Sequence, residues 1–221
     1  MKKALIVYGG WDGHDPVGVA DVFEEILRKE GFEVDRSDDL KAYEGDLRQY
    51  DLLVPDWTMG DISGDGAWNV SEAVASGVGI AGCHAGLCDA FRNCDLWQFV
   101  TGAQFVAHPG GEVTYTVKMN RANPDPITDG IDDFEITSEQ YYLHVDPAVN
   151  VLATIRFPTA DWHHSVNGPV DVPACFTKRW GEGRVFYLSV GHNRYTFDIP
   201  QARELMRRGF LSYYFESNPD G

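Results

Sequence analysis

The chain has 221 residues, 43% of them hydrophobic, which is enough for one sizeable core but short for two independent ones. We therefore expect a single domain over residues 1–221. The formal net charge of −16, from 18 basic and 34 acidic residues, argues against nucleic acid as a partner, because a phosphate backbone requires a surface rich in Lys and Arg.

The sequence predicts no export or membrane segment. Lys2 and Lys3 precede an apolar run, but residues 4–8 are fewer than the hydrophobic region of a signal peptide needs, and no later run is long enough to cross a bilayer. We expect a cytoplasmic protein with no membrane partner, in which the cysteines stay reduced. The oligomeric state stays open, a homo-oligomer included. The four cysteines are Cys83, Cys88, Cys94 and Cys175.

Strands and helices alternate in the first half of the sequence. Apolar runs predict strands at residues 3–8, 32–36, 50–55 and 78–81, and apolar residues at helical spacing predict helices at 16–30 and 66–76. This alternation predicts a parallel sheet with helices on both faces. Ligands of such sheets bind beyond the carboxyl ends of the strands, where the strand-to-helix loops gather.

The loops after the first and third strands carry polar residues. In the first loop Asp15 precedes Pro16, so we expect Asp15 to cap the following helix and leave His14 as a site candidate. Trp11 either stacks on a sugar ring or packs its loop onto the body of the protein. In the loop after the third strand, the aspartates, Asp56 among them, are expected to face solvent.

Residues 82–86, Gly-Cys-His-Ala-Gly, follow the strand at 78–81 and match the Gly-x-Nu-x-Gly pattern of a nucleophile elbow. In that turn the flanking glycines let the backbone lift one side chain above the end of the strand. The alignment places His84 at the tip. Cys83, one residue earlier, should point to the other side. We expect His84 to open into the main cleft.

The second half of the sequence predicts antiparallel strands. Residues 112–119 alternate strictly, further strands are predicted at 134–142, 149–155, 174–179 and 184–190, and a helix begins at Pro200 and runs through 210–214. The turn 181–183, Gly-Glu-Gly, predicts a tight hairpin between the last two strands. Alternation within 134–142 sends Glu139 and Tyr141 to the same side. Residues 157–167 are expected to form a mobile lid that carries Trp162.

Four motifs follow one another along the chain: Gly82-Cys83-His84-Ala85-Gly86, residues 102–109, Ser138-Glu139-Gln140-Tyr141, and Gly181-x-Gly183-Arg184-Val185-Phe186-Tyr187 running into Gly191-His192. In this order they resemble the motifs of the ThuA-like (trehalose utilisation) family, and the resemblance covers nearly the whole chain. The resemblance implies a class I glutamine amidotransferase-like fold, which is a flavodoxin-like three-layer α/β sandwich with a mostly parallel sheet and an antiparallel extension. It also implies a small-molecule sugar substrate, a place in disaccharide catabolism through 3-keto sugars, and similarity to hydrolases of 3-keto-glycosides.

Glutamine hydrolysis is excluded by two changes from the amidotransferase pattern. Those relatives carry Cys at the elbow and His-x-Glu after a late strand, whereas this chain has His84 at the elbow and His192-Asn193-Arg194 later on. A glutaminase needs the thiolate for its acyl-enzyme and a carboxylate that orients the histidine. This chain has neither at the matching positions.

The candidate site combines imidazoles with one carboxylate, which suits an acid-base set or a divalent metal such as zinc. We expect His84, Glu139 and His192 to be catalytic. No His-x-x-x-His or Cys-x-x-Cys spacing indicates a metal, but if one binds, the candidate ligands are His84, His108 and His192. A histidine in a loop more often hydrogen-bonds a backbone carbonyl than takes part in a reaction. This structural role is least expected for His84, because the elbow position is strained. The expected substrate-binding residues are Trp11, His14, His108 and Tyr141.

The reaction expected from the resemblance is an elimination followed by hydration. A 3-keto group acidifies the C2–H of a glycoside, so the aglycone can leave and water can add to the resulting enone. One alternative is a non-catalytic sugar-binding or regulatory protein, because a fold alone does not establish catalysis. The other, a thiol hydrolase that uses Cys83, requires a shift of one residue at the elbow and ranks last.

Overall fold

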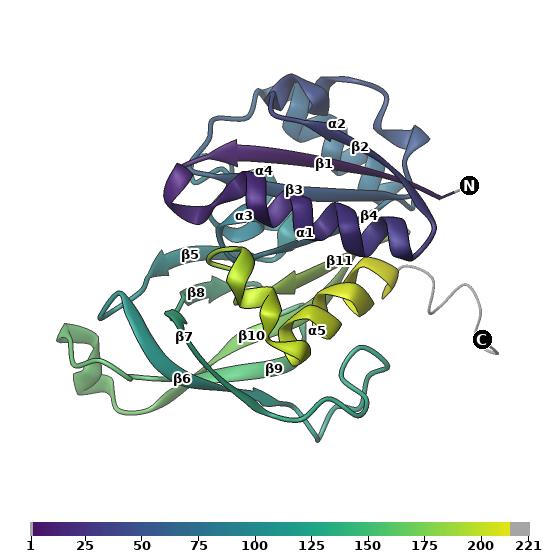
Figure 1. Cartoon of the computed structure of the whole chain (residues 1–221). Helices are drawn as coiled ribbons and strands as arrows, with labels where there is room; N and C mark the ends of the chain where they lie inside the picture. Colours follow the sequence, from purple (N-terminus) through teal and green to yellow (C-terminus); the bar gives the residue numbers. More distant parts are fainter. Residues whose placement is uncertain (1, 213–221) are drawn as a thin grey trace.

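A mixed nine-stranded sheet runs through the protein in the order β2-β1-β3-β4-β11-β10-β9-β6-β7 (Figure 1). The computed structural model describes residues 2–212. Five neighbouring strands are parallel: β2 (Phe32–Ser37), β1 (Lys2–Gly10), β3 (Leu52–Thr58), β4 (Gly79–Cys83) and β11 (Gly183–Leu188). The antiparallel extension contains β10 (Val170–Trp180), β9 (Asn150–Phe157), β6 (Glu112–Met119) and β7 (Phe134–Glu139).

Helices cover both faces of the parallel half, which confirms the α/β flavodoxin-like sandwich with an antiparallel extension. One face packs against α1 (Pro16–Lys29) and α5 (Pro200–Leu211), which lie in front of the sheet in Figure 1. The other face packs against α2 (Gly64–Ala75), α3 (His84–Cys88) and α4 (Asp95–Thr101). The predicted helices at 16–30 and 66–76 are confirmed to within two residues, and the closing helix begins at Pro200 as expected. Residues 213–214 of that prediction lie outside the described part of the chain.

Burial explains why the sequence patterns differ between the two halves of the sheet. The middle of β1, from Ala4 to Val7, is buried on both faces, so it reads as a continuous apolar run. Strand β6 belongs to the extension and alternates between buried and more exposed positions, as a strand with one solvated face does. The hairpin of β10 and β11 is antiparallel, as its Gly-Glu-Gly turn predicts. Among residues 2–212, no helix has the length and apolar character needed to cross a membrane.

The predicted strand at 134–142 is two strands that belong to different sheets. Strand β7 ends at Glu139, and after two residues β8 (Tyr142–Val145) pairs antiparallel with β5 (Ala103–Ala107) in a separate two-stranded ribbon. Gln140 is fully buried at the crossing, where its side-chain amide donates a hydrogen bond to the backbone carbonyl of Arg156. The alternation of side chains does not show this break, because the strand character is similar on both sides of it.

Short 3₁₀ helices occupy several connections of the chain. Two of them matter for the site, because they adjoin the ends of the parallel strands β1 and β11. They are η1 (Asp12–His14) and η5 (Arg194–Asp198), and the others are η2 (Leu40–Glu44), η3 (Leu47–Gln49) and η4 (His163–Asn167).

Candidate functional site

His84 stands at the tip of the turn between β4 and α3. Its φ is +47°, a left-handed conformation that is strained for a residue with a side chain, whereas Cys83 before it is extended. The turn is tightly enclosed, since a Cβ on Gly86 would lie 2.8 Å from Cα of Asp56 and one on Gly191 would lie 2.4 Å from Sγ of Cys83. These two glycines therefore allow neighbouring segments to come close, and the elbow carries His84 rather than Cys83 at its tip. His84 is only 1% exposed, however, so it does not open into a cleft as expected.

Three other elements bring side chains to the same point. His14 ends η1 after strand β1, and Glu139 is the last residue of β7 in the antiparallel extension. His192 follows β11, next to Gly191, whose φ of +146° turns the chain close over the elbow. The carboxyl ends of β1, β4 and β11 thus supply the histidines, and the extension supplies the carboxylate.

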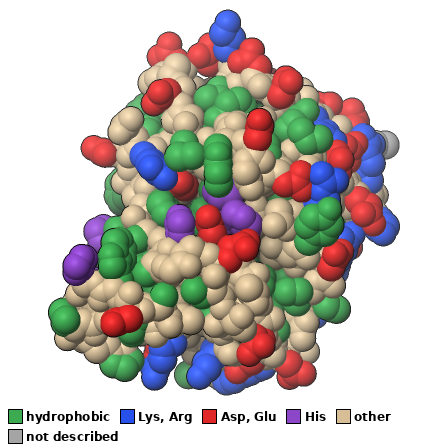
Figure 2. Space-filling view, turned by 60° about the vertical axis from the view of Figure 1, so that its left-hand side comes forward, with side chains coloured by type: hydrophobic (Ala, Val, Ile, Leu, Met, Phe, Trp, Pro, Cys, Tyr) green, Lys and Arg blue, Asp and Glu red, His purple; other side chains and the backbone are tan. Residues whose placement is uncertain are grey.

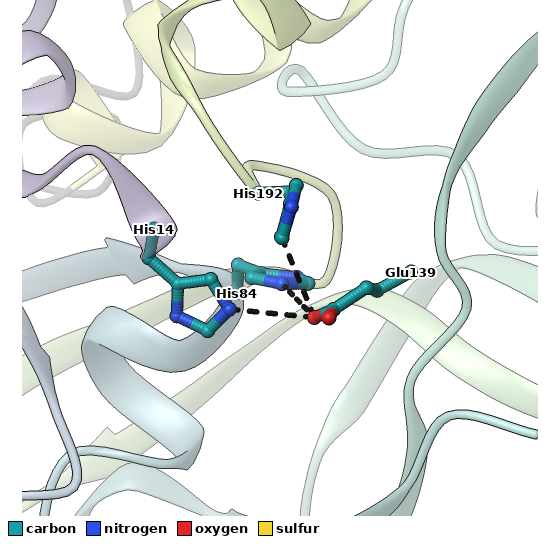
Figure 3. Close-up of side chains that lie close together, drawn as sticks. All are labelled: His14, His84, Glu139 and His192. Atoms are coloured by element: carbon teal, nitrogen blue, oxygen red, sulfur yellow. Dashed lines mark hydrogen bonds and ion pairs between the residues drawn. The ribbon is translucent and has the colours of Figure 1, made fainter. Parts of the chain in front are cut away.

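The four side chains converge on one carboxylate oxygen (Figure 3). Oε2 of Glu139 lies 3.3 Å from Nε2 of His14, 3.2 Å from Nε2 of His84 and 3.4 Å from Nδ1 of His192. One ligand atom from each of the four residues falls within 4.8 Å of the others. His14 and His84 are buried, at 8% and 1% exposure, so the contacts form in a site with little solvent.

The backbone fixes which nitrogen of His84 carries its proton. Nδ1 of His84 donates a hydrogen bond of 2.8 Å to the carbonyl oxygen of Ser189, because a carbonyl oxygen can only accept. Burial lowers the pKa of His84 to about 4, so the ring is neutral near pH 7. In a neutral ring with Nδ1 protonated, Nε2 carries a lone pair instead of a proton. This lone pair faces the Glu139 carboxylate.

Contacts within the cluster shift the pKa values of Glu139 and His192 in opposite directions. Burial alone would raise the pKa of Glu139, but the contacts with His14 and His192 outweigh it and hold that pKa below its ordinary value. Contact with the Glu139 carboxylate raises the pKa of His192, whose Nε2 also lies 3.5 Å from Oε1 of Glu112. Glu139 is therefore an ionised but weakly basic group.

The residues fit a divalent cation. Nδ1 of His192 is buried and has no hydrogen-bond partner among the described residues, and the lone pair of His84 points at a carboxylate without a proton between them. A cation between these atoms removes both problems. Three imidazole nitrogens and one carboxylate oxygen are donors that Zn²⁺ accepts in four-coordinate sites. With these four donors in place, a substrate oxygen would add as a fifth ligand.

The structure places the other candidates around this cluster and corrects two expectations. His14, expected only to bind substrate, belongs to the centre of the cluster. His108 takes the outer position, with Nε2 at 3.8 Å from Oε1 of Glu139, so it is not among the four convergent ligands. The reason is that β5, which precedes His108, is part of the separate ribbon, while His14 adjoins the central strand β1.

Two aromatic candidates contact the cluster directly. The ring of Tyr141 stacks on His84, with centroids 3.7 Å apart, so Tyr141 holds the imidazole plane from one side. It is buried, and it lies between β7 and β8 rather than in the same strand as Glu139. The ring of Trp11 meets His14 edge-on at 4.7 Å and is 48% exposed, so it lies at the rim. Figure 2 shows histidine and carboxylate side chains gathered near the middle of this face, with hydrophobic side chains beside them.

Two aspartates differ from the sequence interpretation. Asp15 occupies the position before α1, but its side chain makes no capping hydrogen bond, and it accepts two hydrogen bonds from Arg194 at 2.6 and 2.7 Å. Asp56 lies inside strand β3, which is longer than predicted, and it is buried rather than solvated. Burial raises the pKa of Asp56 well above its ordinary value.

Cys83 does not have the character of a nucleophile. It is buried, and burial raises the pKa of its thiol well above the ordinary value. His84, in contrast, is held by residues that sequence reasoning missed. The Ser189 carbonyl fixes its tautomer, and the Tyr187 hydroxyl donates a hydrogen bond to its backbone oxygen at 3.2 Å. No side-chain pattern marks the first of these contacts, because a backbone atom makes it.

Comparison with known proteins identifies the family of the chain. The sequence model of the trehalose utilisation family, ThuA, matches residues 3–212. The chain belongs to the ThuA family. No protein of curated function matches it.

Solved structures show that the ThuA fold is shared beyond close sequence relatives. Putative ThuA-like proteins from Bacteroides uniformis and Parabacteroides merdae are each 19% identical to this chain, cover 96% of it with 90% of their own length, and have TM-scores of 0.75 and 0.76. A beta-galactosidase from Rahnella sp. R3 is 17% identical, with a TM-score of 0.63, and covers 99% of this chain with 31% of its own. At these identities the likeness establishes the fold alone.

Proposed function

We propose that this ThuA protein binds a divalent cation at His14, His84, Glu139 and His192 and cleaves 3-keto-glycosides in sugar catabolism. The observation that supports the cation most directly is the lone pair of neutral His84, which faces the Glu139 carboxylate at 3.2 Å. Such an arrangement is repulsive without a positive charge between the two groups. When bound, the cation would supply a Lewis acid that polarises the keto oxygen of the sugar.

The proton transfers are assigned to His108 rather than to Glu139. The lowered pKa of Glu139 makes it a poor proton acceptor, although it remains a good ligand and keeps negative charge in the site. His108 reaches toward the cluster, with Nε2 at 3.8 Å from Oε1 of Glu139, and it is partly exposed at the outer side. It can therefore approach a bound sugar from the solvent side.

The proposed reaction proceeds in two steps, an elimination and a hydration. His108 takes the proton from C2, the electrons of the C–H bond form the C1=C2 double bond, and the bond from C1 to the glycosidic oxygen breaks. The departing oxygen takes the proton from the His108 imidazolium. Water then adds its oxygen to C1 and a proton to C2, which gives the free 3-keto sugar and the released alcohol.

Solvent deuterium tests this reaction. Incubation of the zinc-loaded protein with a 3-keto-disaccharide in D₂O should give a 3-keto sugar that carries deuterium at C2, and unoxidised trehalose should remain intact. An ordinary glycosidase would instead cleave trehalose, and it would need a pair of carboxylates across the bond. Cleavage of trehalose at a comparable rate, or products without deuterium, would contradict the proposal. Binding of the keto sugar without turnover would favour the sugar-binding alternative.

The proposal places the reaction in the cytoplasm. The cysteines of the described residues are all free thiols, and none lies in the cluster. A reducing compartment keeps such thiols reduced. Localisation of a tagged protein in intact cells checks this part of the proposal.

A further inference from the structure

A cavity of about 550 Å³ lies outside the histidine cluster, against the ribbon of β5 and β8. The segment that carries Trp162 forms its other wall. This volume is in the usual range for a small-molecule site. The lining residues are Val106, Ala107, Pro109, Tyr142, Leu143, His144, Val145, Phe157, Pro158, Ala160, Trp162, His164 and Ser165.

The cavity adjoins a second hollow of about 410 Å³, and this second hollow reaches His108 beside the cluster. The two hollows share four lining residues, and one of them is the 52% exposed Trp162. The second hollow is also lined by His108, whose Nε2 lies 3.8 Å from Glu139. A substrate whose glycosidic oxygen lies at His108 can therefore extend away from the cluster and into the larger cavity. The shared residues are Val106, Ala107, Pro109 and Trp162.

The lining of the larger cavity offers few polar side chains to a sugar. Among the described residues that form it, there is no Asp, Glu, Asn, Gln, Lys or Arg, so few groups are present to replace the hydrogen bonds that sugar hydroxyls make with water. Aromatic rings instead face the space. Tyr142 packs edge-on against Phe157 with centroids 5.1 Å apart and lies tilted against His164 at 4.7 Å, and the ring of the lining residue Trp162 is half-exposed.

We propose that this cavity binds an apolar, aromatic leaving group of the glycoside substrate. The proposal rests on the proposed function, because it assigns the sugar to the histidine cluster and the aglycone to the cavity. It narrows the substrate class from disaccharides to aryl glycosides oxidised at C3. Aromatic side chains bind such a group through stacking and the burial of apolar surface.

Direct binding tests the cavity without any turnover. Calorimetry with 4-nitrophenol and with 4-nitrophenyl glucoside should show binding to the wild-type protein, and Trp162→Ala should weaken it by about 10-fold, as the loss of one stacked aromatic contact predicts. Trp68→Ala is the matched control, because Trp68 is 61% exposed on α2, far from this lining. Failure of both aryl ligands to bind, or equal weakening in the two variants, would overturn the proposal.

A variant that fills the cavity, assayed for turnover, separates the aglycone proposal from the proposed reaction. Ala160→Trp should obstruct the cavity and lower kcat/KM for the 3-keto form of 4-nitrophenyl glucoside by at least about 10-fold relative to 3-keto-trehalose, while Ala122→Trp at an exposed turn should not. An equal fall for both substrates would contradict the aglycone site. Binding of the aryl ligands together with no turnover of either keto sugar would refute the reaction but support the cavity as an aryl site.

Discussion

The carbonyl oxygen of Ser189 accepts a hydrogen bond of 2.8 Å from Nδ1 of His84 and so decides what the other nitrogen of that ring can do. Nε2 is left with its lone pair directed to the centre of the cluster. Metal-bound histidines are commonly oriented in this way, by a carbonyl or carboxylate on the second ring nitrogen. The contact joins β11 to the elbow after β4, so the fold itself prepares His84 as a ligand.

The first prediction is that the protein binds one divalent cation per chain. Protein stripped with a chelator and titrated with Zn²⁺ should take up one equivalent in calorimetry, and mass spectrometry of the elements should find it after dialysis. His84→Ala and Glu139→Gln should each lower the affinity by at least about 100-fold, because the first removes one of four donors and the second removes the negative charge of the carboxylate donor. Activity with the keto sugar should disappear on stripping and return with the metal.

Cys83→Ala is the control for these ligand variants. Cys83 is next to His84 and buried, so its loss should cost about 1 kcal/mol of unfolding free energy through packing while metal binding and activity stay the same. Loss of zinc in this variant would point to the thiol as a ligand. Retention of full zinc affinity in His84→Ala and Glu139→Gln would refute the metal site.

The sequence predicted the fold closely, because its signals are local. Continuous apolar runs such as Ala4 to Val7 exist where helices cover both faces of a strand, and the helical spacing of Val19, Phe23 and Ile26 matches the stripe that α1 buries. The elbow was also predictable, since a left-handed residue between glycines has a recognisable pattern. The resemblance to the ThuA family rested on the same motifs.

The detailed site was less predictable, since it depends on how distant segments meet. His14 rather than His108 lies at the centre because the chain leaves the large sheet after Glu139. Side-chain alternation carries no sign of that break. The partner of Asp15 is another example. Arg194 is 179 residues away, so the local pattern before Pro16 favoured a helix cap instead.

Arg194 is predicted to position His14 and His192. Its guanidinium binds both oxygens of Asp15, which follows His14 directly, and Arg194 itself lies two residues after His192. Arg194→Ala should therefore lower zinc affinity and kcat/KM by about 10-fold, with little change in Tm, because exposed ion pairs contribute little to stability. Arg194→Lys should recover only part of the lost zinc affinity and kcat/KM, since an ammonium cannot bind both carboxylate oxygens as a guanidinium does.

A second exposed pair provides the comparison for Arg194. Arg156 binds Asp171 with the same two-point geometry, at 2.8 and 2.7 Å, within the antiparallel extension. Arg156→Ala should leave zinc affinity and turnover at the wild-type level. If the two alanine variants behave alike in calorimetry and kinetics, the positioning role is wrong.

Gly191 is predicted to be irreplaceable for stability. A Cβ there would lie 2.4 Å from Sγ of Cys83, and the φ of +146° is a conformation that side chains disfavour. Gly191→Ala should lower the unfolding free energy by roughly 2–4 kcal/mol, as overpacking and backbone strain together do. Urea unfolding monitored by circular dichroism measures the change.

The matched substitution for Gly191 is Gly64→Ala at the start of α2. A Cβ at Gly64 would meet nothing within 4 Å, so alanine should be neutral or stabilise the helix by up to about 1 kcal/mol. A Gly191→Ala protein as stable as Gly64→Ala would show that the elbow can relax away from β11.

The last prediction concerns the pH dependence of stability and depends on Asp56. Oδ2 of this carboxyl is buried without a hydrogen-bond partner among the described residues, and burial raises its pKa well above the ordinary value of 3.8. The folded protein therefore keeps a proton on Asp56 at pH values where the unfolded chain has released it. Because the folded state binds more protons in this window, the contribution of Asp56 falls as pH rises from about 4 toward the folded pKa.

Asp56→Asn removes this loss of stability at higher pH, since the amide has nearly the same shape as the carboxyl and no charge to bury. The difference in unfolding free energy between the variant and the wild type should shift in favour of the variant as pH rises from 4 to 8, by about 1.4 kcal/mol for each unit by which the folded pKa exceeds the unfolded one. Urea unfolding at several pH values measures it. Asp61→Asn is the matched control, because it removes a carboxylate at an exposed position of the following loop. A difference that stays constant with pH for Asp56→Asn would show that this carboxyl is ionised in the folded protein.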